Sequence, residues 1–404
     1  MAMATRASPE LAAGQATLQS ARAGRRIATG EYLPSLGVAS SGGRGTIVQG
    51  SNAVTNGIPV ASSSRPLDDV FGSGVSVALP VFTGGRRGAD RRNADALLNA
   101  ADAGLVAAEY DTRLATKETY FDVLRAGDLV EVASAQVAQA ERAMRDAESR
   151  LRAGTTTRSD VLRAQVALAS AHDALASAGA NRTASEFELA RTIGSDSPVG
   201  AAPVADDVSI PLQISRESLV ASAVNGAPIA RAAAANAQAA DAAIGAAKAQ
   251  YLPTVLASGG YGWLDQRSVN PHPVGGWTLQ MGVSYPLFNG FQREAALTRA
   301  EANADAARSI QLDTQRGIRA DAVRAYDAAT VAAQRIGFAR EAVAAAQEDL
   351  RVQELRYRAG ASTFLDEVTS QLNLTQAATA LVQARYDYQI ARAMLERVLG
   401  RELQ

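Results

Sequence analysis

The sequence repeats itself, and this duplication limits the possible folds more than any single motif does. Residues 72–197 align with the second half of the chain at a constant offset of 206 positions, without a gap. Further upstream, Pro9 and residues 32–34 match Pro228 and residues 251–253 at an offset of 219. Two copies of one unit predict two structural repeats, residues 1–200 and 201–404, rather than two unrelated domains.

The composition excludes several classes of protein. The net charge of −1 gives no reason to expect nucleic acid as a partner, and the absence of cysteine excludes disulfides and a catalytic thiol. The sequence contains no run of about 18 apolar residues, so it predicts no transmembrane helix. His172 and His272 lie far apart in the sequence, so we expect no metal site, and no residue constellation supports a cofactor or an enzyme. The chain also opens without an apolar segment, so we expect a signal peptide and further helical turns to precede Met1.

Each copy reads as helix, strand, loop, strand, very long helix, turn and helix. The strands fall at about 31–82 and 251–288, where Leu279, Met281 and Val283 alternate with polar or small residues. This period of two predicts a sheet with unlike environments on its two faces. We expect a long loop over residues 42–67, and we expect Pro80 to end the pairing of its strand.

The helical segments are exceptionally long. The predicted helices span residues 9–27, 86–152, 159–193, 216–250, 292–358 and 366–399, with a linker at 195–214. Each of the two longest would measure about 100 Å, more than a globular core requires. Within them a large residue recurs every seven positions, and the residue three positions later is usually alanine. This heptad pattern predicts a thin coiled-coil seam. The seam residues are Val130, Val137, Met144, Leu151, Ala133, Ala140 and Ala147, and in the second copy Ile336, Val343, Leu350, Tyr357, Ala339, Ala346 and Gln353.

Four strands cannot close a barrel alone, because the known membrane barrels begin at eight strands. An open edge in lipid would leave backbone groups unpaired, so a membrane location requires several chains to share one barrel. Two chains would give eight strands and a filled interior, and three would give twelve and room for a channel. The aromatic residues Trp263, Trp277, Tyr261 and Tyr285 lie near predicted strand ends, as in an outer-membrane interface. The alternative is that they pack a water-soluble sheet.

Short motifs at fixed places carry a resemblance to a known family. Leu-Pro-x-Phe-x-Gly leads from strand to helix at 79–84, and Arg-Ala-Gly-x-x-Thr-x-x-Asp recurs at 152–160 and 358–366. With the duplicated order of elements, these motifs resemble the TolC family of outer-membrane efflux and secretion channels over essentially the whole chain. The resemblance implies a mixed, mostly α fold. It also implies a homotrimer with a 12-stranded transmembrane β-barrel continued by a 12-helix coiled-coil α-barrel in the periplasm. Outer-membrane lipid, a periplasmic adaptor protein and an inner-membrane ABC or proton-driven transporter are the implied partners.

The same resemblance suggests residues for a periplasmic entrance at the helix tips. It implies that Asp366 is a ring aspartate, Tyr357 an entrance tyrosine and Ser159 a small hydroxyl residue of the closing network. The turns themselves are at Gly154 and Gly360.

Two departures from the family pattern affect this entrance. Thr369 stands where a second ring aspartate is expected, and Ser362 stands where an arginine is expected. The closing contacts are therefore either weaker or dependent on Arg358 or Arg158. Asp160 is more simply interpreted as stabilising a helix N-terminus, and Asp366 could have this role as well as a place in the ring.

The sequence thus predicts a passive exit duct that performs no catalysis. The alternative is a periplasmic coiled-coil scaffold without a pore, which the alternating strands disfavour. Within the duct hypothesis the cargo is either small molecules or a protein of type I secretion. Many drug-efflux members carry a lipid on an N-terminal cysteine, so the lack of cysteine leans toward secretion.

Overall fold

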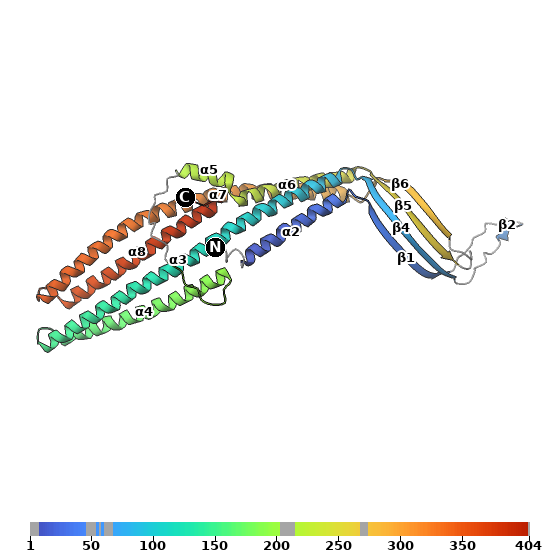
Figure 1. Ribbon diagram of the computed structural model, residues 1–404. Coiled ribbons are helices and arrows are strands. Elements are labelled where there is room, and N and C mark those ends of the chain that lie inside the picture. Colours follow the sequence, from blue (N-terminus) through green and yellow to red (C-terminus); the bar gives the residue numbers. More distant parts are fainter. Residues whose placement is uncertain are drawn as a thin grey trace. The chain divides into compact units, whose positions relative to one another are not determined.

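The computed structural model describes residues 8–45, 54–55, 58–59, 68–202, 215–266 and 274–402. Helices dominate, beside a four-stranded sheet and a two-stranded β2–β3 pair (Figure 1), so the mixed and mostly α fold is confirmed. The helices are α2 (Pro9–Gly30), α3 (Arg86–Arg152), α4 (Arg158–Ile193), α5 (Arg216–Gly226), α6 (Pro228–Lys248), the short 3-10 helix η1 (Ala249–Tyr251), α7 (Gln292–Arg358) and α8 (Phe364–Leu399). The strands are β1 (Ser35–Gly45), β2 (Val54–Thr55), β3 (Ile58–Pro59), β4 (Asp68–Phe82), β5 (Thr254–Gln266) and β6 (Val274–Ser284).

Internal contacts group the chain into two compact units. Unit 1 consists of Met1–Leu18, Ala100–Ala234 and Ile310–Gln404, and unit 2 consists of Gln19–Asn99 and Ala235–Ser309. The four-stranded sheet belongs to unit 2, whereas the turns that end the long helices belong to unit 1. Each unit draws on both halves of the chain, and the division into two sequence repeats remains a prediction.

The long helices α3 and α7 have the predicted bounds of 86–152 and 292–358, with 67 residues each. Neither contains a proline, so no backbone N–H is missing from the helical hydrogen bonds. Glycines with positive φ precede them, with 63° at Gly84 and 66° at Gly290. Helix bounds of this kind are set by local residues, which explains why the sequence alone located them.

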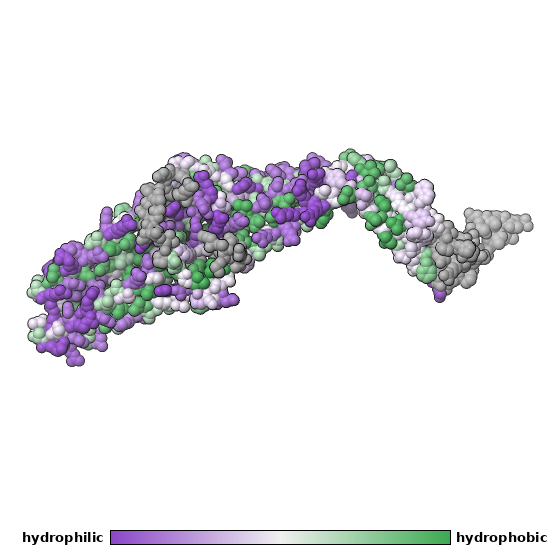
Figure 2. Space-filling view, viewed as in Figure 1, coloured by the Kyte–Doolittle hydropathy of each residue, from purple (hydrophilic) through white to green (hydrophobic). Residues whose placement is uncertain are grey.

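The sheet is antiparallel with the order β1-β4-β5-β6. Its register places Val38 beside Val75, Val75 beside Tyr261, and Tyr261 beside Trp277, all on one face. Serine, threonine, glutamine, glycine and alanine make up most of the other face, which also carries Pro80 and Leu256, and this confirms the predicted difference between the faces. Figure 2 shows hydrophobic residues gathered over the strands, and Leu279 on this apolar face is 77% exposed.

The two edges of the sheet are open. Among the described residues β1 and β6 each pair with one neighbour in the sheet, whereas β4 and β5 each pair with two. The outer side of an edge strand carries backbone N–H and C=O groups that can pair with another chain. The sheet can therefore be extended at both sides by further strands.

The strand bounds differ from the sequence prediction in three places. α2 continues to Gly30 and ends in a turn in which Leu33 N donates to Gly30 O, so β1 begins at Ser35. β1 then runs to Gly45, so the predicted loop at 42–67 begins too early, and it contains the β2–β3 pair. Pro80 does not end its strand either, because β4 continues to Phe82 through a register shift beside Pro80. A proline removes one donor, which a bulge accommodates.

The predicted helix 216–250 is two helices. α5 ends at Gly226 and α6 begins at Pro228, with Ala227 between them at φ −59° and ψ 128°. This extended conformation follows from the proline, whose ring disfavours helical geometry in the preceding residue. Residues 203–214 of the predicted linker at 195–214, and the loop with His272, lie outside the described residues.

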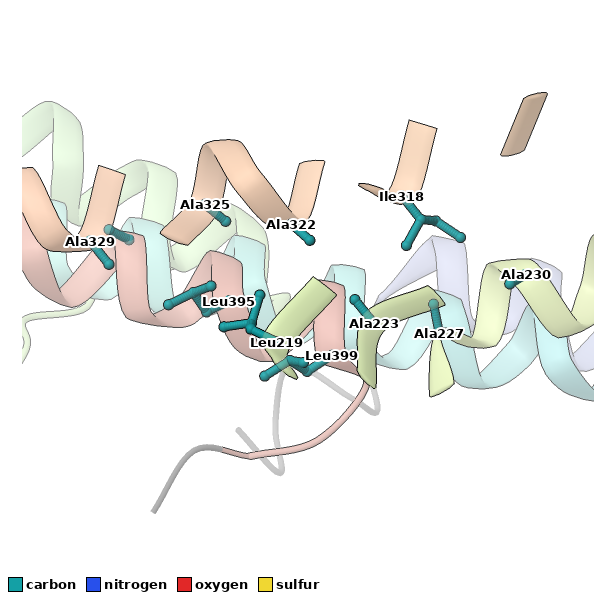
Figure 3. Packing of buried hydrophobic residues seen from close by; sticks show 11 residues of the cluster. Leu219, Ala223, Ala227, Ala230, Ile318, Ala322, Ala325, Ala329, Leu395 and Leu399 are labelled. Atoms are coloured by element: carbon teal, nitrogen blue, oxygen red, sulfur yellow. The ribbon is translucent and has the colours of Figure 1, made fainter. Parts of the chain in front are cut away.

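Alanine makes up most of the helical core. Figure 3 shows a buried cluster in unit 1 where leucines of α5 and α8 meet alanines of α7. Its buried residues are Leu219, Ala223, Ala227, Ala230, Ile318, Ala322, Ala325, Ala329, Ala391, Leu395 and Leu399. Val137 and Ala140 of the predicted seam pack on Ala171 of α4, so α4 returns along α3 as expected. Small side chains let helices approach closely along their length.

Candidate functional site

Two helix hairpins end in matching turns within unit 1, one between α3 and α4 and one between α7 and α8 (Figure 1). Gly154 and Gly360 occupy these turns with φ of 71° and 74°. Gly154 N donates to Leu151 O, and Gly360 N donates to Tyr357 O. Left-handed glycine at this position is the common way to end a helix, so both predicted helix-tip glycines lie where the chain must turn.

Each return helix begins with a threonine and an aspartate that cap each other. Thr157 Oγ1 accepts a hydrogen bond from Asp160 N at 3.3 Å, and Thr157 N donates to Asp160 Oδ2 at 3.3 Å. In α8, Thr363 Oγ1 accepts from Asp366 N at 3.2 Å, and Thr363 N donates to Asp366 Oδ2 at 2.9 Å. These capping boxes satisfy backbone donors that the helix leaves free.

The caps also set the acidity of the two carboxyl groups. Hydrogen bonds from the backbone and side chain of Thr363 lower the pKa of Asp366. Partial burial of Asp160 acts to raise its pKa, but hydrogen bonds from Thr156 and Thr157 outweigh this and lower it. Both groups are therefore anionic at neutral pH. Asp366 is also exposed, so capping leaves it free to meet solvent or an ion.

Tyr357 joins the two hairpins. Its side chain is 7% exposed, and its hydroxyl lies 3.5 Å from Thr156 Oγ1 at the opposite tip. The Arg150 guanidinium of α3 lies over the tyrosine ring, and Arg150 Nη1 donates to Tyr357 O at 2.8 Å. The ring of Phe364 packs 5.7 Å from that of Tyr357. Sequence analysis missed Arg150, because only packing between distant helices identifies it.

The other predicted entrance residues have local contacts. Arg358 Nη2 lies 3.9 Å from Glu354 Oε2 on its own helix, so this arginine does not join the tips. Thr369 Oγ1 donates to Leu365 O at 2.8 Å, one turn earlier in α8. Ser159 is exposed on α4. These three residues lie at the tips as predicted, but in this single chain the hydrogen bonds between the two tips join Arg150 and Thr156 to Tyr357.

A buried acid lies beside this bridge. Glu367 of α8 is 6% exposed, and its Oε1 accepts a 3.4 Å hydrogen bond from Nε2 of Gln371. It follows Phe364 by three positions and therefore lies on the packed face of α8. The sequence does place Glu367 on an apolar face of its helix, but sequence analysis did not single it out.

The surroundings of Glu367 disfavour its charge. Burial raises the pKa of Glu367 to about 7, and repulsion from Glu354 and Asp146 acts in the same direction. The guanidinium groups of Arg150 and Arg358 oppose this shift without reversing it. Glu367 can therefore change its charge near neutral pH, unlike the two capping aspartates.

An apolar groove of about 500 Å³ runs beside the tips. It lies in unit 1 between α4 and α8, with α3 also contributing to its lining. Its apolar walls include Leu162, Val166, Leu365, Val368 and Leu372. Most of these side chains are half exposed or more in the single chain, which makes the groove a surface available to another polypeptide.

The predicted aromatic residues of the sheet lie toward its two ends. Tyr261 pairs with Trp277 across β5 and β6, and its ring meets that of Trp263 edge-on at 4.9 Å. Trp277 is 76% exposed on the apolar face. Tyr285 directly follows the other end of β6 and is also exposed.

Open sheet edges, an exposed apolar sheet face and long paired helices define the class of outer-membrane channel subunits. The family model of the outer membrane efflux proteins matches residues 2–195 and 219–401. Because these matches cover most of its length, the chain belongs to the outer membrane efflux protein family. The predicted resemblance and the outer-membrane location are thereby confirmed.

Individual relatives agree with the family. The chain is 26% identical over 388 residues to the outer membrane efflux protein BepC of Brucella suis biovar 1 (strain 1330), covering 96% of this chain and 82% of BepC. The outer membrane protein VceC of Vibrio cholerae has a TM-score of 0.85 at 22% identity, with 100% of this chain and 95% of VceC covered. The CmeC outer membrane channel of Campylobacter jejuni has a TM-score of 0.84 at 17% identity, with 98% of this chain and 84% of CmeC covered. At these identities the structures support the fold.

No helix in the described part of the chain has the length and apolar character needed to cross a membrane. Within the same residues, no group of three or more histidine, aspartate or glutamate side chains is placed to hold a metal ion.

Proposed function

We propose that three copies of this chain form a passive exit duct of a tripartite efflux or secretion system. The four-stranded sheets of the three copies form a 12-stranded barrel in the outer membrane. The long helices form a 12-helix tunnel in the periplasm. The duct performs no catalysis, and the energy for transport comes from an inner-membrane transporter.

The observation that carries this proposal is the sheet with an apolar face and two open edges. An unpaired backbone group in hydrocarbon costs several kcal/mol, so the free sides of β1 and β6 need partners in a membrane. Pairing β6 of one copy with β1 of the next satisfies these groups around a closed ring. Three copies give twelve strands, enough for an open channel, whereas two copies would give a filled barrel.

The aromatic residues lie near the two edges expected of a membrane-spanning apolar band. Trp277 in β6 and Tyr285 directly after it are about 27 Å apart along the strand, at roughly 3.4 Å per residue, and a strand tilt of about 35–45° reduces this to about 20 Å across the membrane. Outer-membrane barrels carry an apolar band about 25 Å tall between two aromatic girdles. Trp263 and Tyr261 belong to the girdle of Trp277, and Tyr285 belongs to the opposite one. A water-soluble scaffold would have no reason to expose this face.

The helix tips serve as the gate in this proposal. In a trimer each tip residue is present three times around one axis, so Asp366 forms a ring of three carboxylates. Such a ring attracts cations and repels anions at a narrow opening. Tyr357 and Ser159 contribute to the closing contacts, with Thr369 and Arg358 beside them. Gly154 and Gly360 provide the turns on which the hairpins move.

The groove between α4 and α8 is a suitable docking surface for a periplasmic adaptor protein. Leu162 and Val166 on one wall face Leu365 and Leu372 on the other, and an amphipathic helix could bury these side chains. The adaptor in turn joins the duct to an ABC or proton-driven transporter. Photo-crosslinking from a photoreactive residue at position 162 or 166 to a co-expressed periplasmic adaptor protein tests the contact.

The cargo has two candidates. The family description, outer membrane efflux protein, favours efflux, for which small molecules are the first candidate cargo. A protein cargo of type I secretion is the second candidate. Deleting the gene separates the two candidates. Increased sensitivity to small toxic compounds indicates efflux, and loss of a protein from the culture medium indicates secretion.

Mass and conductance measurements test the duct itself. Light scattering in detergent should give a protein mass near three times 41.9 kDa, and planar bilayers should show discrete ion currents. A single-copy protein in lipid nanodiscs would contradict the trimer. A protein that dissolves in plain buffer and gives no current would instead support the coiled-coil scaffold.

A further inference from the structure

Glu367 is a carboxyl group enclosed where two helix hairpins meet. The buried cluster at this point combines Ala147 of α3, Ala164 of α4, Tyr357 of α7 and Phe364 of α8. Glu367 lies on the same face of α8, one turn after Phe364, and is nearly as inaccessible. A charge at this position is removed from water by the packing that holds the hairpins together.

Charged groups from two other helices act on Glu367. Asp146 and Arg150 face it from α3, and Glu354 and Arg358 face it from α7. The two acidic groups repel an ionised Glu367. The two arginines attract it, but each also contacts another group, which limits this attraction.

Arg150 and Arg358 are committed to other partners. Arg150 lies over the Tyr357 ring at 4.4 Å from its centroid and donates to the carbonyl oxygen of that residue. Arg358 lies 3.9 Å from Glu354. The side-chain hydrogen bond of Glu367 in the described structure comes from the neutral amide of Gln371. The packed tip thus holds the carboxyl without an ion pair of its own.

We propose that Glu367 is a proton-operated latch. While its carboxyl is protonated it holds α8 against α3 and α7, and when it loses the proton it loosens the tip. This inference rests on the proposed function, because it assigns a control to the gate of the duct. The signal would be the pH of the compartment that contains the helix tips.

The direction of the effect follows from proton linkage. The pKa of Glu367 is about 7 when packed, against 4.5 for a freely solvated glutamate. The packed tip therefore binds the proton more tightly than an opened tip. Its advantage is complete below pH 4.5 and is lost as the pH rises through about 7. The packed-to-open equilibrium can change by at most about 300-fold over this range.

The neighbouring acids do not reproduce this behaviour. Hydrogen bonds in the capping boxes lower the pKa values of Asp160 and Asp366, so both remain ionised from pH 5.5 to 8.5. His172 and His272 are the two histidines of the 404-residue sequence. A background with His172→Gln and His272→Gln removes both imidazoles from every protein compared.

Planar bilayer recordings in this background test the latch. Open probability is measured between pH 5.5 and 8.5 on the side of the helix tips. The parent protein should show an increase of about tenfold or more with a midpoint near 7. Glu367→Gln is uncharged at every pH and should stay at the low, acid-like value. Glu341→Gln, which removes an exposed glutamate from α7, should follow the parent.

A second measurement does not depend on conduction. The chain has no cysteine, so spin labels on Ser149→Cys in α3 and Ala361→Cys at the second turn are unique. Dilution with unlabelled chains isolates the distance within one copy. The distance distribution should broaden above pH 7 in the parent and stay narrow in Glu367→Gln.

The outcomes separate the latch from the duct. A Glu367→Gln protein that keeps the parent's pH midpoint, or spin-label distances that ignore pH in the parent, would overturn the latch while the duct stands. A parent that conducts no ions at any pH would overturn the duct. The spin-label distances would then still decide whether Glu367 controls the packing of the tips.

Discussion

The guanidinium of Arg150 lies 4.4 Å from the ring centroid of Tyr357 and donates a 2.8 Å hydrogen bond to the carbonyl oxygen of the same residue. One side chain of α3 thus holds both the ring and the backbone of the last turn of α7. The carbonyl that it binds also accepts from Gly360 N, the donor that ends the helix. This contact couples the end of α7 directly to the other hairpin.

Replacing Arg150 should loosen the tips. Arg150→Met removes the cation–π contact and the hydrogen bond, together worth about 2 kcal/mol. We expect a higher open probability in planar bilayers at pH 5.5, where Glu367 is protonated with or without the arginine. Arg152→Met removes a nearby exposed arginine as a matched control. Equal effects of the two substitutions would show that charge alone, rather than the Tyr357 contact, matters.

Asp366 and Asp160 form a natural pair for testing the entrance. Asp366→Ala should raise single-channel conductance and reduce cation selectivity, because it removes the carboxylates of the proposed ring. Asp160→Ala should cost about 1 kcal/mol of stability through its cap and leave selectivity unchanged. Reversal potentials in asymmetric salt measure the selectivity. If Asp366→Ala leaves both conductance and selectivity unchanged, Asp366 does not line the entrance.

The same pair predicts a pH dependence. Because the folded-state pKa of each aspartate is lowered, the cap contributes its stability above the ordinary value of 3.8. That contribution is lost only as the pH falls through the lowered value. Cation selectivity should therefore persist down to about pH 5 and decline below about pH 4. A decline centred near pH 7 would point to Glu367 instead.

Local features of the sequence were sufficient to predict much of the fold. The bounds of α3 and α7 follow from glycines before and after a stretch without proline, and the sheet faces follow from simple alternation. The break at Ala227 was also within reach, since Pro228 restricts the residue before it. That break was missed because the helical period continues across it.

The candidate site was less predictable, because its contacts join residues far apart in the chain. Arg150 and Tyr357 are separated by 207 positions, and the groups acting on Glu367 come from α3 and α7. A capping box can be recognised from four consecutive residues, and so Asp160 was correctly interpreted. The burial of Glu367 depends on how two hairpins pack, which single-sequence patterns do not specify.

Phe291 is held in a backbone conformation that suits glycine. Its φ is 62°, and its counterpart in the first repeat, Gly85, has φ of 86°. The strain should be about 1–2 kcal/mol for a residue with a side chain. Phe291→Gly and Phe291→Ala both lose the edge-on contact with Phe288 at 5.5 Å, but only glycine relieves the strain. Thermal unfolding should therefore rank the glycine variant above the alanine variant.

Phe288 supplies the control for this comparison. Phe291 is the non-glycine residue with positive φ in the described structure, so Phe288 has an ordinary backbone conformation. There, alanine should be at least as stable as glycine, because glycine loses more entropy on folding. The same ranking at both positions would refute backbone strain at Phe291.

Adjacent residues of β6 test whether the apolar sheet face meets lipid. Trp277 lies on that face beside Tyr261, whereas Thr278 lies on the opposite face beside Gly260. Trp277→Ala should weaken the detergent-extracted assembly by about 2 kcal/mol per subunit, because it removes a large side chain from the membrane interface. Thr278→Ala should have little effect, because it removes one small polar group from the opposite face. The temperature at which the assembly dissociates measures both. A larger loss of assembly stability for Thr278→Ala than for Trp277→Ala would reverse the assignment of the faces. The apolar residues of all four strands would then point into the assembly and not toward lipid.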